Sequence, residues 1–400
     1  MFRPVDEQLA ILLRGAAQVE TEKELRAKLE RSLKTNTPLR VKYGIDPTGF
    51  DVHLGHTVPL RKLRQFQELG HTAVLIIGTA TAQVGDPSGR DSSRTGLTPE
   101  SIQKNAENYL TQIAKVVDTS KAEVRPNGEW FGKWGFADML KLLGQSTVGQ
   151  ILAREDFSNR VKAGTAIYLH ECLYPLMQGW DSVEIHADVE LGGTEQLFNL
   201  MVGRDLQKGA GQEPQICLTM PILRGLDGEK KMGKSLGNFI GVGEPPREQF
   251  GKTMSIPDPL MREWYTLLTD IPSGEVDAIL AGHPNDAKKR LGAEVVKWFN
   301  GADAAERALS DWAVQFAGGK GGDPTDMPEV SISAGEMSVL DLIVAAKLTE
   351  SKGQARKKVE EGAFNYGPDK TKPADWKATV SVTDGLVLRL GKKVVRVKAS

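Results

Sequence analysis

The sequence predicts an α/β protein with a parallel sheet, followed by a helical region and a small α+β unit. Between residue 41 and about residue 241, short apolar runs alternate with segments of helical periodicity, a pattern typical of parallel sheets with crossover helices. After Pro245 and Pro246 the apolar residues follow helical spacing alone. A glycine-rich stretch then leads to a basic C-terminal part. A length of 400 residues is enough for two or three domains.

The first predicted strand, residues 39–45, leads through a short loop into a predicted helix. This helix begins at His-Leu-Gly-His (residues 53–56), carries apolar residues on one face and stops at Gly70. Further apolar runs predict strands at residues 73–78 and 216–220. Ligands of parallel sheets bind at the carboxyl ends of the strands, so the loops after these strands are the expected site.

Two helical segments complete this region. A helix is predicted over residues 99–117, with Thr98 as its N-cap and Pro99 in its first turn. Residues 130–185 are predicted to be helices inserted into the α/β alternation. Their aromatic residues, Trp130 to Phe136, fit a packed core slightly better than an exposed interface.

The remaining elements divide the chain into domains. Two helices, residues 339–346 and 351–361, and strands at 379–382 and 386–397 are predicted after the glycine-rich stretch. We expect a first domain at residues 1–241 with an insertion at about 130–185, a helical domain at 242–317, a flexible linker at 318–334 and a small basic domain at 335–400.

The composition is that of a water-soluble globular chain, with 40% hydrophobic residues and a formal net charge of −1. No uncharged apolar run approaches the roughly 20 residues that span a bilayer, and the N-terminus carries charges instead of a signal sequence. Cys172 and Cys217 form no CxxC pair, which argues against a disulfide framework and a cysteine zinc site. We therefore expect a cytoplasmic protein without a membrane partner.

Charge is distributed unevenly along the chain. Residues 345–400 contain thirteen Lys and Arg against six Asp and Glu, which is +7 and leaves −8 for the rest. A local positive charge on an otherwise acidic protein is typical of a nucleic-acid contact, because basic side chains neutralise phosphates. The alternative is an ordinary solvated helix face.

Two motifs about 180 residues apart indicate a site for a nucleoside triphosphate. In the first, the helix start at His53 and His56 presents backbone N–H groups and imidazoles to phosphate oxygens, and Gly55 leaves room for a flat adenine. In the second, Lys231 and Lys234 of Lys-Met-Gly-Lys-Ser can close on a leaving pyrophosphate, and the glycine-rich surroundings predict a flexible loop.

Each motif alone has a simpler explanation. Two histidines three residues apart can be metal ligands, but no third ligand follows at a recognisable spacing. A lysine-rich loop with glycines is usually solvated surface. Their joint occurrence, in this order and after a predicted strand, favours the catalytic interpretation.

Four further motifs lie around and between these two. They are Lys-Tyr-Gly-Ile-Asp-Pro-Thr (42–48) with Val-Gly-Asp-Pro-Ser-Gly (84–89), Tyr-Pro-Leu-Met-Gln-Gly-Trp-Asp (174–181) and Gly-Gly-Thr-Glu-Gln (192–196). With the phosphate motifs, which resemble the HIGH and KMSKS signatures, they make the chain similar to class I aminoacyl-tRNA synthetases. It resembles in particular the tyrosyl-tRNA synthetases of the bacterial long-chain type, nearly from end to end.

The resemblance implies a Rossmann-like catalytic domain that activates L-tyrosine with ATP and then transfers it to tRNA(Tyr). It implies a homodimer formed through the insertion, and Mg²⁺ bound with the ATP phosphates rather than by protein ligands. No DNA partner is expected. A site that hydrogen-bonds a hydroxyl rejects the analogue without it, and tyrosyl-tRNA synthetases are themselves a known example, with a preference of about 10⁵ over phenylalanine.

The family's site residues can be carried over position by position. The catalytic residues would be Thr48, His53, His56, Lys231, Lys234 and Ser235, and the ATP-binding residues Gly55, Gly193, Glu195 and Lys234. The tyrosine-binding residues would be Asp86, Tyr174 and Gln178 at the ammonium, Asp181 at the phenol, Gln196 near the carboxyl group and Lys42 as a further partner of the phenol.

The C-terminal part, in turn, resembles a small RNA-binding domain named after a protein of the small ribosomal subunit. Lys352, Arg356, Lys357 and Lys358 would then face RNA backbone, where shape and phosphate contacts dominate recognition.

Four residues, at three places in the sequence, depart from the family pattern. Lys42-Tyr43 replaces the frequent Tyr-Cys, Gly233 stands where the signature has serine, and Glu195 replaces the commoner aspartate. We expect these departures to tune rates rather than abolish activity.

Three other functions are weighed against this one. A tryptophanyl-tRNA synthetase shares the fold and signatures, but Asp46, the pair Gln178 and Asp181, and the basic C-terminal unit argue against it. A small-molecule nucleotidyltransferase would not need that unit. A non-catalytic RNA-binding protein on the same scaffold would not need both phosphate motifs intact.

Overall fold

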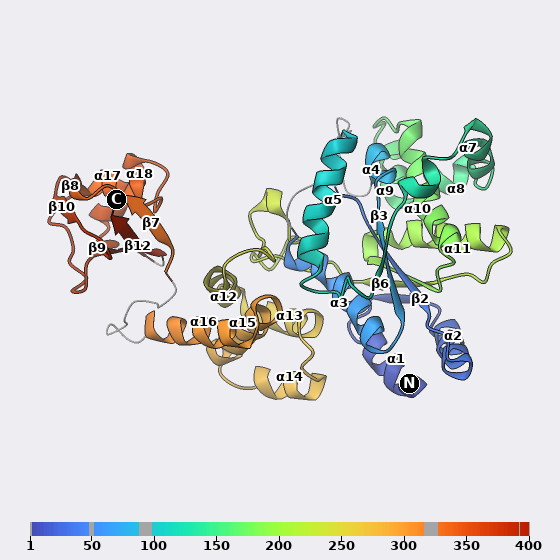
Figure 1. Ribbon diagram of the computed structural model, residues 1–400, viewed down its shortest axis with the longest axis horizontal. Helices are drawn as coiled ribbons and strands as arrows, with labels where there is room; N and C mark the ends of the chain where they lie inside the picture. The colour runs from blue at the N-terminus through green and yellow to red at the C-terminus, as the bar shows by residue number, and fades with distance from the viewer. Residues whose placement is uncertain (1, 48–51, 88–97, 316–326, 392, 400) are drawn as a thin grey trace. The chain divides into compact units, whose positions relative to one another are not determined.

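The computed structural model describes residues 2–47, 52–87, 98–315, 327–391 and 393–399. The chain forms two compact units, Met1–Ala305 and Glu306–Ser400, whose division falls within one helix, Ala302–Gln315 (α16). Figure 1 shows the first unit in blue to orange and most of the second in red. None of the helices in the described ranges is long and apolar enough to cross a membrane.

A six-stranded sheet forms the centre of the first unit. Its strands are β1 (Gln18–Glu20), β2 (Arg40–Ile45), β3 (Thr72–Ile77), β4 (Glu123–Pro126), β5 (Val189–Gly193) and β6 (Ile216–Met220). They lie in the order β1-β6-β5-β2-β3-β4. All neighbours are parallel except β1, which pairs antiparallel with β6. The order changes direction at β2, so the loops after β2 and β5 lie at a topological switch point.

The helices of the first unit follow the same chain order. They are α1 (Val5–Leu13), α2 (Glu22–Thr35), α3 (Leu54–Glu68), α4 (Thr81–Val84), α5 (Pro99–Ile113), α6 (Gly128–Phe131), α7 (Phe136–Leu143), α8 (Val148–Leu152), α9 (Glu155–Lys162), α10 (Leu169–Glu184), α11 (Leu197–Gly209), α12 (Pro246–Met254), α13 (Met261–Leu268), α14 (Ser273–Leu280) and α15 (Pro284–Asn300). Short 3₁₀ turns are η1 (Thr194–Gln196), η2 (Lys234–Leu236) and η3 (Asp258–Leu260).

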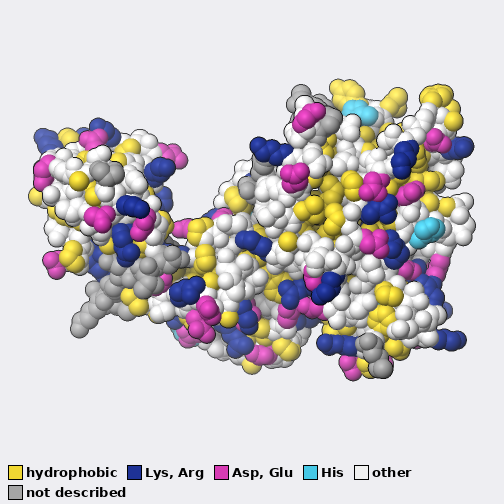
Figure 2. Space-filling model, in the orientation of Figure 1, with side chains coloured by type: hydrophobic (Ala, Val, Ile, Leu, Met, Phe, Trp, Pro, Cys, Tyr) yellow, Lys and Arg dark blue, Asp and Glu magenta, His cyan; other side chains and the backbone are white. Residues whose placement is uncertain are grey.

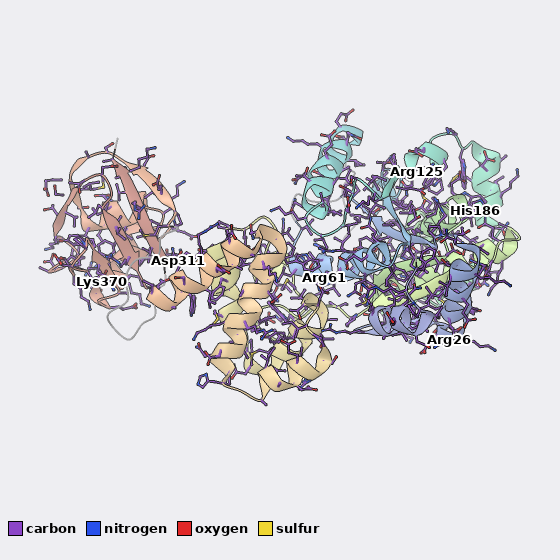
Figure 3. The ribbon with its side chains drawn as sticks, turned by 60° about the horizontal axis from the view of Figure 1, so that its bottom comes forward. Arg26, Arg61, Arg125, His186, Asp311 and Lys370 are labelled. Carbon is purple, nitrogen blue, oxygen red and sulfur yellow. The ribbon has the colours of Figure 1, made fainter. Side chains whose placement is uncertain are left out.

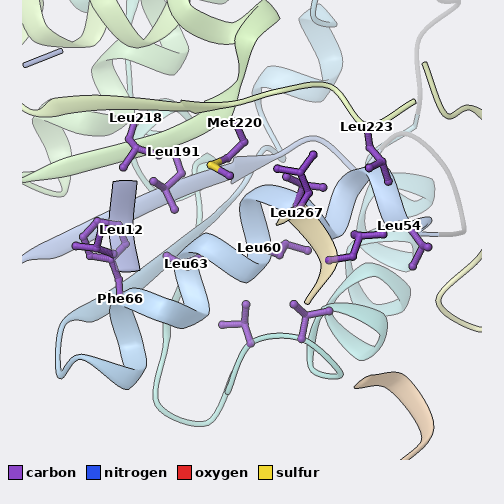
Figure 4. Close-up of a cluster of buried hydrophobic side chains, with 14 of the residues drawn as sticks. Leu12, Leu54, Leu60, Leu63, Phe66, Leu191, Leu218, Met220, Leu223 and Leu267 are labelled. Atoms are coloured by element: carbon purple, nitrogen blue, oxygen red, sulfur yellow. The ribbon is translucent and has the colours of Figure 1, made fainter. Parts of the chain in front are cut away.

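Apolar runs made the central strands predictable because both faces of the sheet are covered. Every residue of β6 is buried, and β3 is buried apart from its first residue. On one face α3 packs its apolar stripe against β2, β3 and β5, with Leu63 and Phe66 fully buried. Figure 4 shows these two side chains with Leu191 and Leu218 from β5 and β6. The predicted parallel α/β sheet is confirmed.

Helix α3 is also anchored at its far end. The guanidinium of Arg61 is buried, donates to Asp270 at 2.7 Å and lies 3.6 Å from the ring centroid of Trp298 on α15. Figure 3 labels Arg61 beside the helical region. The helix that begins at the first motif is therefore fixed to the helices that follow the sheet in sequence.

The insertion, residues 130–185, is helical as predicted and contains α6 to α10. Its aromatic residues pack inward: Trp130 is buried, and Trp134 meets Trp180 edge to face at 5.3 Å. Phe136 is the exception, with 79% of its surface exposed. The core interpretation therefore holds for the tryptophans and not for Phe136.

The second unit contains two small sheets and two helices. Its strands are β7 (Glu329–Ile332), β8 (Gly335–Ser338), β9 (Phe364–Tyr366), β10 (Thr379–Val382), β11 (Val387–Leu390) and β12 (Lys393–Ala399), and its helices after α16 are α17 (Val339–Ala345) and α18 (Lys352–Glu360). One sheet has the order β7-β12-β11-β9 and the other pairs β10 with β8. The unit has its own apolar core around Leu342, Phe364 and Leu388.

Two details of the second unit differ from the predictions. The expected linker reaches to residue 334, but its residues 329–332 form β7, which pairs in parallel with β12. The single strand expected over 386–397 is two antiparallel strands, β11 and β12. Alternating apolar residues continue through both, and Gly391, with φ of 60°, permits the reversal.

Candidate active site

A cavity of about 460 Å³ opens at the carboxyl ends of β2, β3 and β5 in the first unit. It is lined by predicted site residues from all of the motifs: His53, Gly55, His56, Asp86, Tyr174, Gln178, Asp181, Gly193, Glu195, Gln196 and Lys231. The structure thus brings these predicted residues together around one cavity. Thr48, and Ser88 and Gly89 of the motif at residues 84–89, lie outside the described residues.

His53 and His56 lie at the first turn of α3. His53 is the N-cap residue, and its ring stacks on that of His56 with 3.8 Å between centroids. The Gly55 amide donates to Nδ1 of His53 at 3.1 Å, and the His53 amide donates to Nδ1 of His56 at 3.3 Å. Because each Nδ1 accepts a hydrogen bond, a neutral ring carries its proton on Nε2.

Both histidines are neutral. Burial lowers the pKa of His53 to about 3, with further lowering from His56 and Lys234. Burial, followed by the charge of Lys234, lowers the pKa of His56 to about 4. Each ring therefore offers one Nε2–H as a donor.

Gly55 has a steric reason to be glycine. A Cβ atom there would lie 3.0 Å from the ring of His53, closer than ordinary packing allows. The residue also lines the cavity, so backbone is accessible at this point. The position of the His53 ring is thus one reason for a glycine here, in addition to the expected contact with adenine.

The loop of the second motif is braced rather than loose. The side chain of Asn238 accepts from the Gly233 amide at 2.9 Å and donates to Asp227 and to the carbonyl oxygen of Lys231, at 2.6 and 3.1 Å. Lys231 and Met232 line the cavity, whereas Ser235 is exposed and is not part of the lining. Lys234 acts on both histidines through its charge.

A chain of hydrogen bonds holds the residues expected at the substrate ammonium. Gln196 donates to Asp86 at 2.8 Å, and Asn199 donates to the side-chain oxygens of Gln196 and Gln178, at 2.9 and 3.0 Å. Arg154 closes the chain by donating to Asn199 at 3.2 Å and to Asp86 at 3.4 Å. The amides and the carboxylate are therefore held in fixed orientations.

Tyr174 belongs to a second polar group at the end of β2. Its hydroxyl donates to Asp46 at 2.9 Å, and Thr81 donates to the other oxygen of the same carboxylate at 2.7 Å. Gly78 must lack a side chain here, because a Cβ atom would lie 2.0 Å from Asp46. Asp46 thereby orients the tyrosine that lines the cavity.

Asp181 lies at the buried end of the site, with 3% of its surface exposed. The indole N–H of Trp130 donates to one of its oxygens at 3.0 Å and Asn127 to the other at 3.3 Å. Burial raises the pKa of Asp181 to about 7, against the lowering effects of Lys42, Asn127 and Trp130. The carboxylate is thus aligned by two donors and changes charge near neutral pH.

Lys42 does not line the cavity, and its expected contact with the phenol is not supported. Its side chain is fully buried, and three oxygen atoms lie around Nζ: the Gln178 carbonyl at 2.7 Å, the Ser182 hydroxyl at 2.8 Å and the Glu190 carboxylate at 2.9 Å. An ammonium group has only three N–H donors. All three are therefore matched by protein acceptors.

Glu195 lies at the rim of the cavity, in turn η1. Its carboxylate folds over Gly193, where an added Cβ would lie 2.2 Å from a carboxylate oxygen. The glycine thus allows Glu195 to turn back toward the cavity. This geometry is compatible with the predicted contact to a ribose.

The basic residues expected to contact RNA lie on α18, at the surface of the second unit. Lys352 pairs with Asp341, Arg356 with Glu360 and Lys358 with Glu361. Arg356 also lies over the ring of Trp376, at 4.5 Å. Three of the four cations thus have acidic partners that a phosphate backbone would have to displace.

Sequence reasoning missed several residues that orient the site. They are Asp46 and Thr81, Asn127 and Trp130, and Arg154 and Asn199. Asp46 and Asn127 each follow the last residue of a parallel strand, a position that could have identified them. Arg154 and Asn199 carry no such signal, because their contacts join segments far apart in sequence.

The arrangement has the parts that acyl-phosphate chemistry requires. Neutral donors at a helix start and a lysine in the lining suit phosphate oxygens, and a deep polar end suits a hydroxyl group. Within the described ranges, no three His, Cys, Asp or Glu side chains are grouped so as to hold a metal ion.

Two family models match the chain. The family of tRNA synthetases class I (W and Y) matches residues 34–316, which is more than half of the chain. The Tyrosine--tRNA ligase SYY-like C-terminal domain matches residues 321–395. Together they extend over both compact units.

Relatives named Tyrosine--tRNA ligase align over nearly the full length. The protein of Symbiobacterium thermophilum is 49% identical over 98% of this chain and 97% of its own length. That of Moorella thermoacetica is 47% identical over 97% of this chain and 95% of its own.

Solved structures share the fold. A tyrosyl-tRNA synthetase from Archaeoglobus fulgidus, determined in complex with L-tyrosine, superposes with a TM-score of 0.61 at 24% identity, over 76% of this chain and 100% of its own. A C-terminally truncated mitochondrial tyrosyl-tRNA synthetase from Coccidioides posadasii superposes with a TM-score of 0.62 at 21% identity, over 76% of this chain and 91% of its own. These similarities show the architecture of the catalytic part.

Proposed function

The chain belongs to the class I tRNA synthetases of the tryptophan and tyrosine group, and within them to the tyrosine--tRNA ligases, and from this premise we propose how its cavity performs the reaction. The enzyme activates L-tyrosine with ATP and transfers it to tRNA. The observation that carries the proposal is the single cavity in which the phosphate motifs meet Asp86, Gln178 and Asp181.

Tyrosine lies with its ring along the cavity floor and its hydroxyl at Asp181. The phenol O–H donates to this carboxylate, which Trp130 and Asn127 hold in place. At the other end, the ammonium group meets Asp86, Tyr174 and Gln178. Three oxygen acceptors suit the three donors of an ammonium ion, and the hydrogen-bond chain through Asn199 fixes two of them.

Activation requires no general base. The carboxylate of tyrosine is ionised at neutral pH, so one of its oxygens attacks the α-phosphorus directly. The new P–O bond forms as the bond from the α-phosphorus to the bridging oxygen breaks, and pyrophosphate leaves with the electron pair. The Nε2–H groups of His53 and His56 and the ammonium groups of Lys231 and Lys234 stabilise the charge on these oxygens.

Mg²⁺ enters this site with ATP, bound to its phosphates. The described residues offer no cluster of protein ligands, which suits an ion carried by the substrate. Such an ion neutralises part of the triphosphate charge. In this proposal Gly193 and Glu195 bind the adenosine, with Glu195 at the ribose, and Gln196 binds near the reacting carboxyl group; all three residues line the cavity.

The second half-reaction transfers the tyrosyl group to the 3′-terminal adenosine of tRNA(Tyr). A ribose hydroxyl oxygen attacks the carbonyl carbon of the adenylate, and an ester bond forms as the bond from that carbon to the phosphate oxygen breaks. AMP leaves with the electron pair, and the hydroxyl proton passes to its phosphate or to water. The basic second unit supports this step by binding RNA through α18. Of the four cations named on that helix, Lys357 makes no ion pair with a described acidic residue, although its charge lowers the pKa of Glu361, so it would engage phosphate with little to displace.

The enzyme works as a cytoplasmic homodimer. Helix α7 exposes one apolar face, with Phe136 at 79%, Leu140 at 52% and Leu143 at 46% of their surface accessible. Val148 and Leu169 belong to the same insertion and have 75% and 89% of their surface exposed. Hydrophobic side chains gather at the upper right of Figure 2, where α7 lies in Figure 1. Such a patch on one element is typical of a subunit interface.

The oligomeric state can be tested by mass. Analytical ultracentrifugation at micromolar concentration is expected to give twice the chain mass of 43.6 kDa. Replacing Leu140 and Leu143 by aspartate is expected to give the monomer. A stable monomer of the parent chain at that concentration would contradict the proposal.

The reaction itself is tested by exchange between ATP and labelled pyrophosphate. Tyrosine, phenylalanine and tryptophan are offered separately to the purified chain, so that activation is measured without tRNA. Exchange with tyrosine alone is expected. Exchange with tryptophan would contradict the assignment of Asp181 to a hydroxyl, and no exchange at all would favour an RNA-binding protein on this scaffold.

A further inference from the structure

A buried ion pair lies directly beneath the floor of the tyrosine site. Lys42 on β2 and Glu190 on β5 are register partners in the parallel sheet, with exposed fractions of 0% and 1%. Alternation along a strand places Lys42 and Gly44 on one face, and Glu190 and Gly192 likewise. Gly44 and Gly192 both line the cavity. Lys42 and Glu190 precede them by two residues on the same strands, so the pair lies about 7 Å from these glycines along the strand direction.

The missing side chain of Gly44 creates the space for a ligand. A Cβ atom there would have no other atom within 4 Å, and Gly44 is paired with Ile76, which also lines the cavity. A flat ring can therefore lie over this point of the sheet. Lys42 lies on the same face of β2, two residues before Gly44, and is therefore next to this space along the strand.

The pair holds the turn of α10 that faces it. Lys42 donates to the Gln178 carbonyl and to the Ser182 hydroxyl, at 2.7 and 2.8 Å. Asp181 lies between these two residues in the same turn. A clamp on both ends of residues 178–182 therefore fixes where the Asp181 carboxylate sits.

Glu190 completes the clamp from the neighbouring strand. Its Oε1 lies 2.9 Å from Lys42 and accepts from the side chain of Gln178 at 3.2 Å. Its Oε2 accepts from Ser182 at 3.0 Å and from Gln215 at 2.5 Å. The described contacts of the pair thus run to α10 and to Gln215, the residue that precedes β6.

A buried ion pair is weak as a means of stabilisation, because desolvation offsets most of the attraction, but it can fix one arrangement among several. Resting on the proposed function, we propose that Lys42 and Glu190 are a positioning pair for the hydroxyl-reading end of the site, and that they contribute to the preference for tyrosine over phenylalanine. The pair acts through the α10 turn and touches no substrate atom.

The test compares tyrosine and phenylalanine in pyrophosphate exchange for a double variant, Lys42→Met with Glu190→Gln. Both charges are removed together, because removal of Lys42 alone would leave a buried carboxylate without its cation. We expect the ratio of kcat/KM for tyrosine to that for phenylalanine to fall about tenfold, through a higher KM for tyrosine, while KM for ATP stays within about twofold.

A matched control lies on the same strand. Arg40 on β2 pairs with Glu123 on β4 through two hydrogen bonds, of 2.6 and 2.7 Å, away from the cavity. The double variant Arg40→Met with Glu123→Gln is expected to keep the amino-acid ratio of the parent. If both double variants lower the ratio alike, the effect is a general one on the sheet and the proposal is wrong.

A milder variant covers the case in which the first fails to fold. Ser182→Ala removes only the hydroxyl that joins Lys42 to Glu190 and is expected to lower the ratio about threefold. An unchanged ratio in a folded variant with tyrosine-dependent exchange would overturn the positioning role alone. Absence of tyrosine-dependent exchange in the parent chain would overturn the proposed function and, with it, this inference.

Discussion

Burial lowers the pKa of His53 to about 3 and that of His56 to about 4, so both rings are uncharged over the physiological range. A neutral donor placed where negative charge grows can strengthen its hydrogen bond in the transition state without holding the substrate tightly beforehand. The positive charges of the site come instead from Lys231 and Lys234. Donors and cations are thus supplied by different motifs.

Variants of His56 test this division. His56→Ala is expected to lower kcat for activation by about 10²–10³, with KM for tyrosine little changed, because a transition-state donor is lost. His56→Gln retains an N–H near the position of Nε2 and is expected to keep more of the rate. His186→Asn is the control, since His186 (labelled in Figure 3) is exposed, adopts a φ of 51° that asparagine tolerates, and is not among the residues that line the cavity. Equal rates for the glutamine and alanine variants would contradict a donor role.

Asp181 predicts a pH dependence that the histidines do not. Its pKa is raised to about 7 by burial, so below that pH the carboxyl group is protonated and one oxygen no longer accepts the phenol O–H. We expect kcat/KM for tyrosine to fall as the pH drops from 8 to 6, because the competent ionised form is lost. Lys42 opposes and Glu190 favours this protonation.

The measurement is the pH profile of exchange with tyrosine and, in parallel, with phenylalanine at high concentration. Phenylalanine has no hydroxyl to bind and is expected to show no fall over this range. A tyrosine profile that is flat between pH 6 and 8 would show that Asp181 does not titrate there.

At the scale of elements, apolar patterning predicted β2, β3 and β6 of the central sheet and did not single out β1, β4 and β5. Strands β3 and β6 were found because both faces are buried in hydrocarbon. Strand β5 was not singled out, since Glu190 interrupts its apolar run, and its burial depends on Lys42 from a strand almost 150 residues earlier. Pairings of this kind exist only in space.

The residues of the site, too, were predictable only where a sequence motif contains them. Residues that a motif carries, such as His53 and Asp181, line the cavity, because motifs record groups that meet substrate. Arg154 and Asn199 orient those groups and have no motif of their own. Lys42 shows the opposite case. It belongs to a motif and was predicted to contact the substrate, but it is buried and contacts only protein groups.

The loop of the second motif predicts an effect of Asn238. This residue is buried and makes three of the hydrogen bonds that hold residues 227–233 in shape. Asn238→Ala is expected to lower kcat for activation about tenfold, the effect of about 1.4 kcal/mol, because Lys231 is no longer held toward the cavity. Tyrosine binding, measured by calorimetry without ATP, is expected to be unchanged. Equal losses in both measurements would indicate general unfolding.

Gly233 tests the one departure within that loop. Its φ of −164° is extended backbone open to any residue, and an added Cβ would meet no atom closer than 3.8 Å. Gly233→Ser is therefore expected to fold normally and to change kcat for activation severalfold by adding a hydroxyl donor near the phosphates. Unchanged activation kinetics would contradict any role of this position.

At the scale of the whole molecule, the proposed function assigns amino-acid chemistry to the first unit and RNA binding to the second. The cavity lies wholly in the first unit, and the second unit has its own core and sheets. The excess positive charge is concentrated in residues 345–400, so most of the long-range attraction for a polyanion comes from a part that contributes nothing to the activation site.

Truncation after residue 320 exploits this separation, because it retains α16 complete and removes the second unit's sheets. Tyrosine-dependent exchange is expected to stay within about twofold of the full chain, since no cavity residue is lost. Charging of tRNA(Tyr) is expected to need at least about tenfold more tRNA and to depend less steeply on salt, because fewer phosphates are neutralised. The control is the quadruple alanine variant of Lys352, Arg356, Lys357 and Lys358 in the full chain, which is expected to reproduce the charging defect. If truncation weakens charging and the alanine variant does not, RNA is held by another face of the second unit; if exchange falls as well, the two units share the activation step after all.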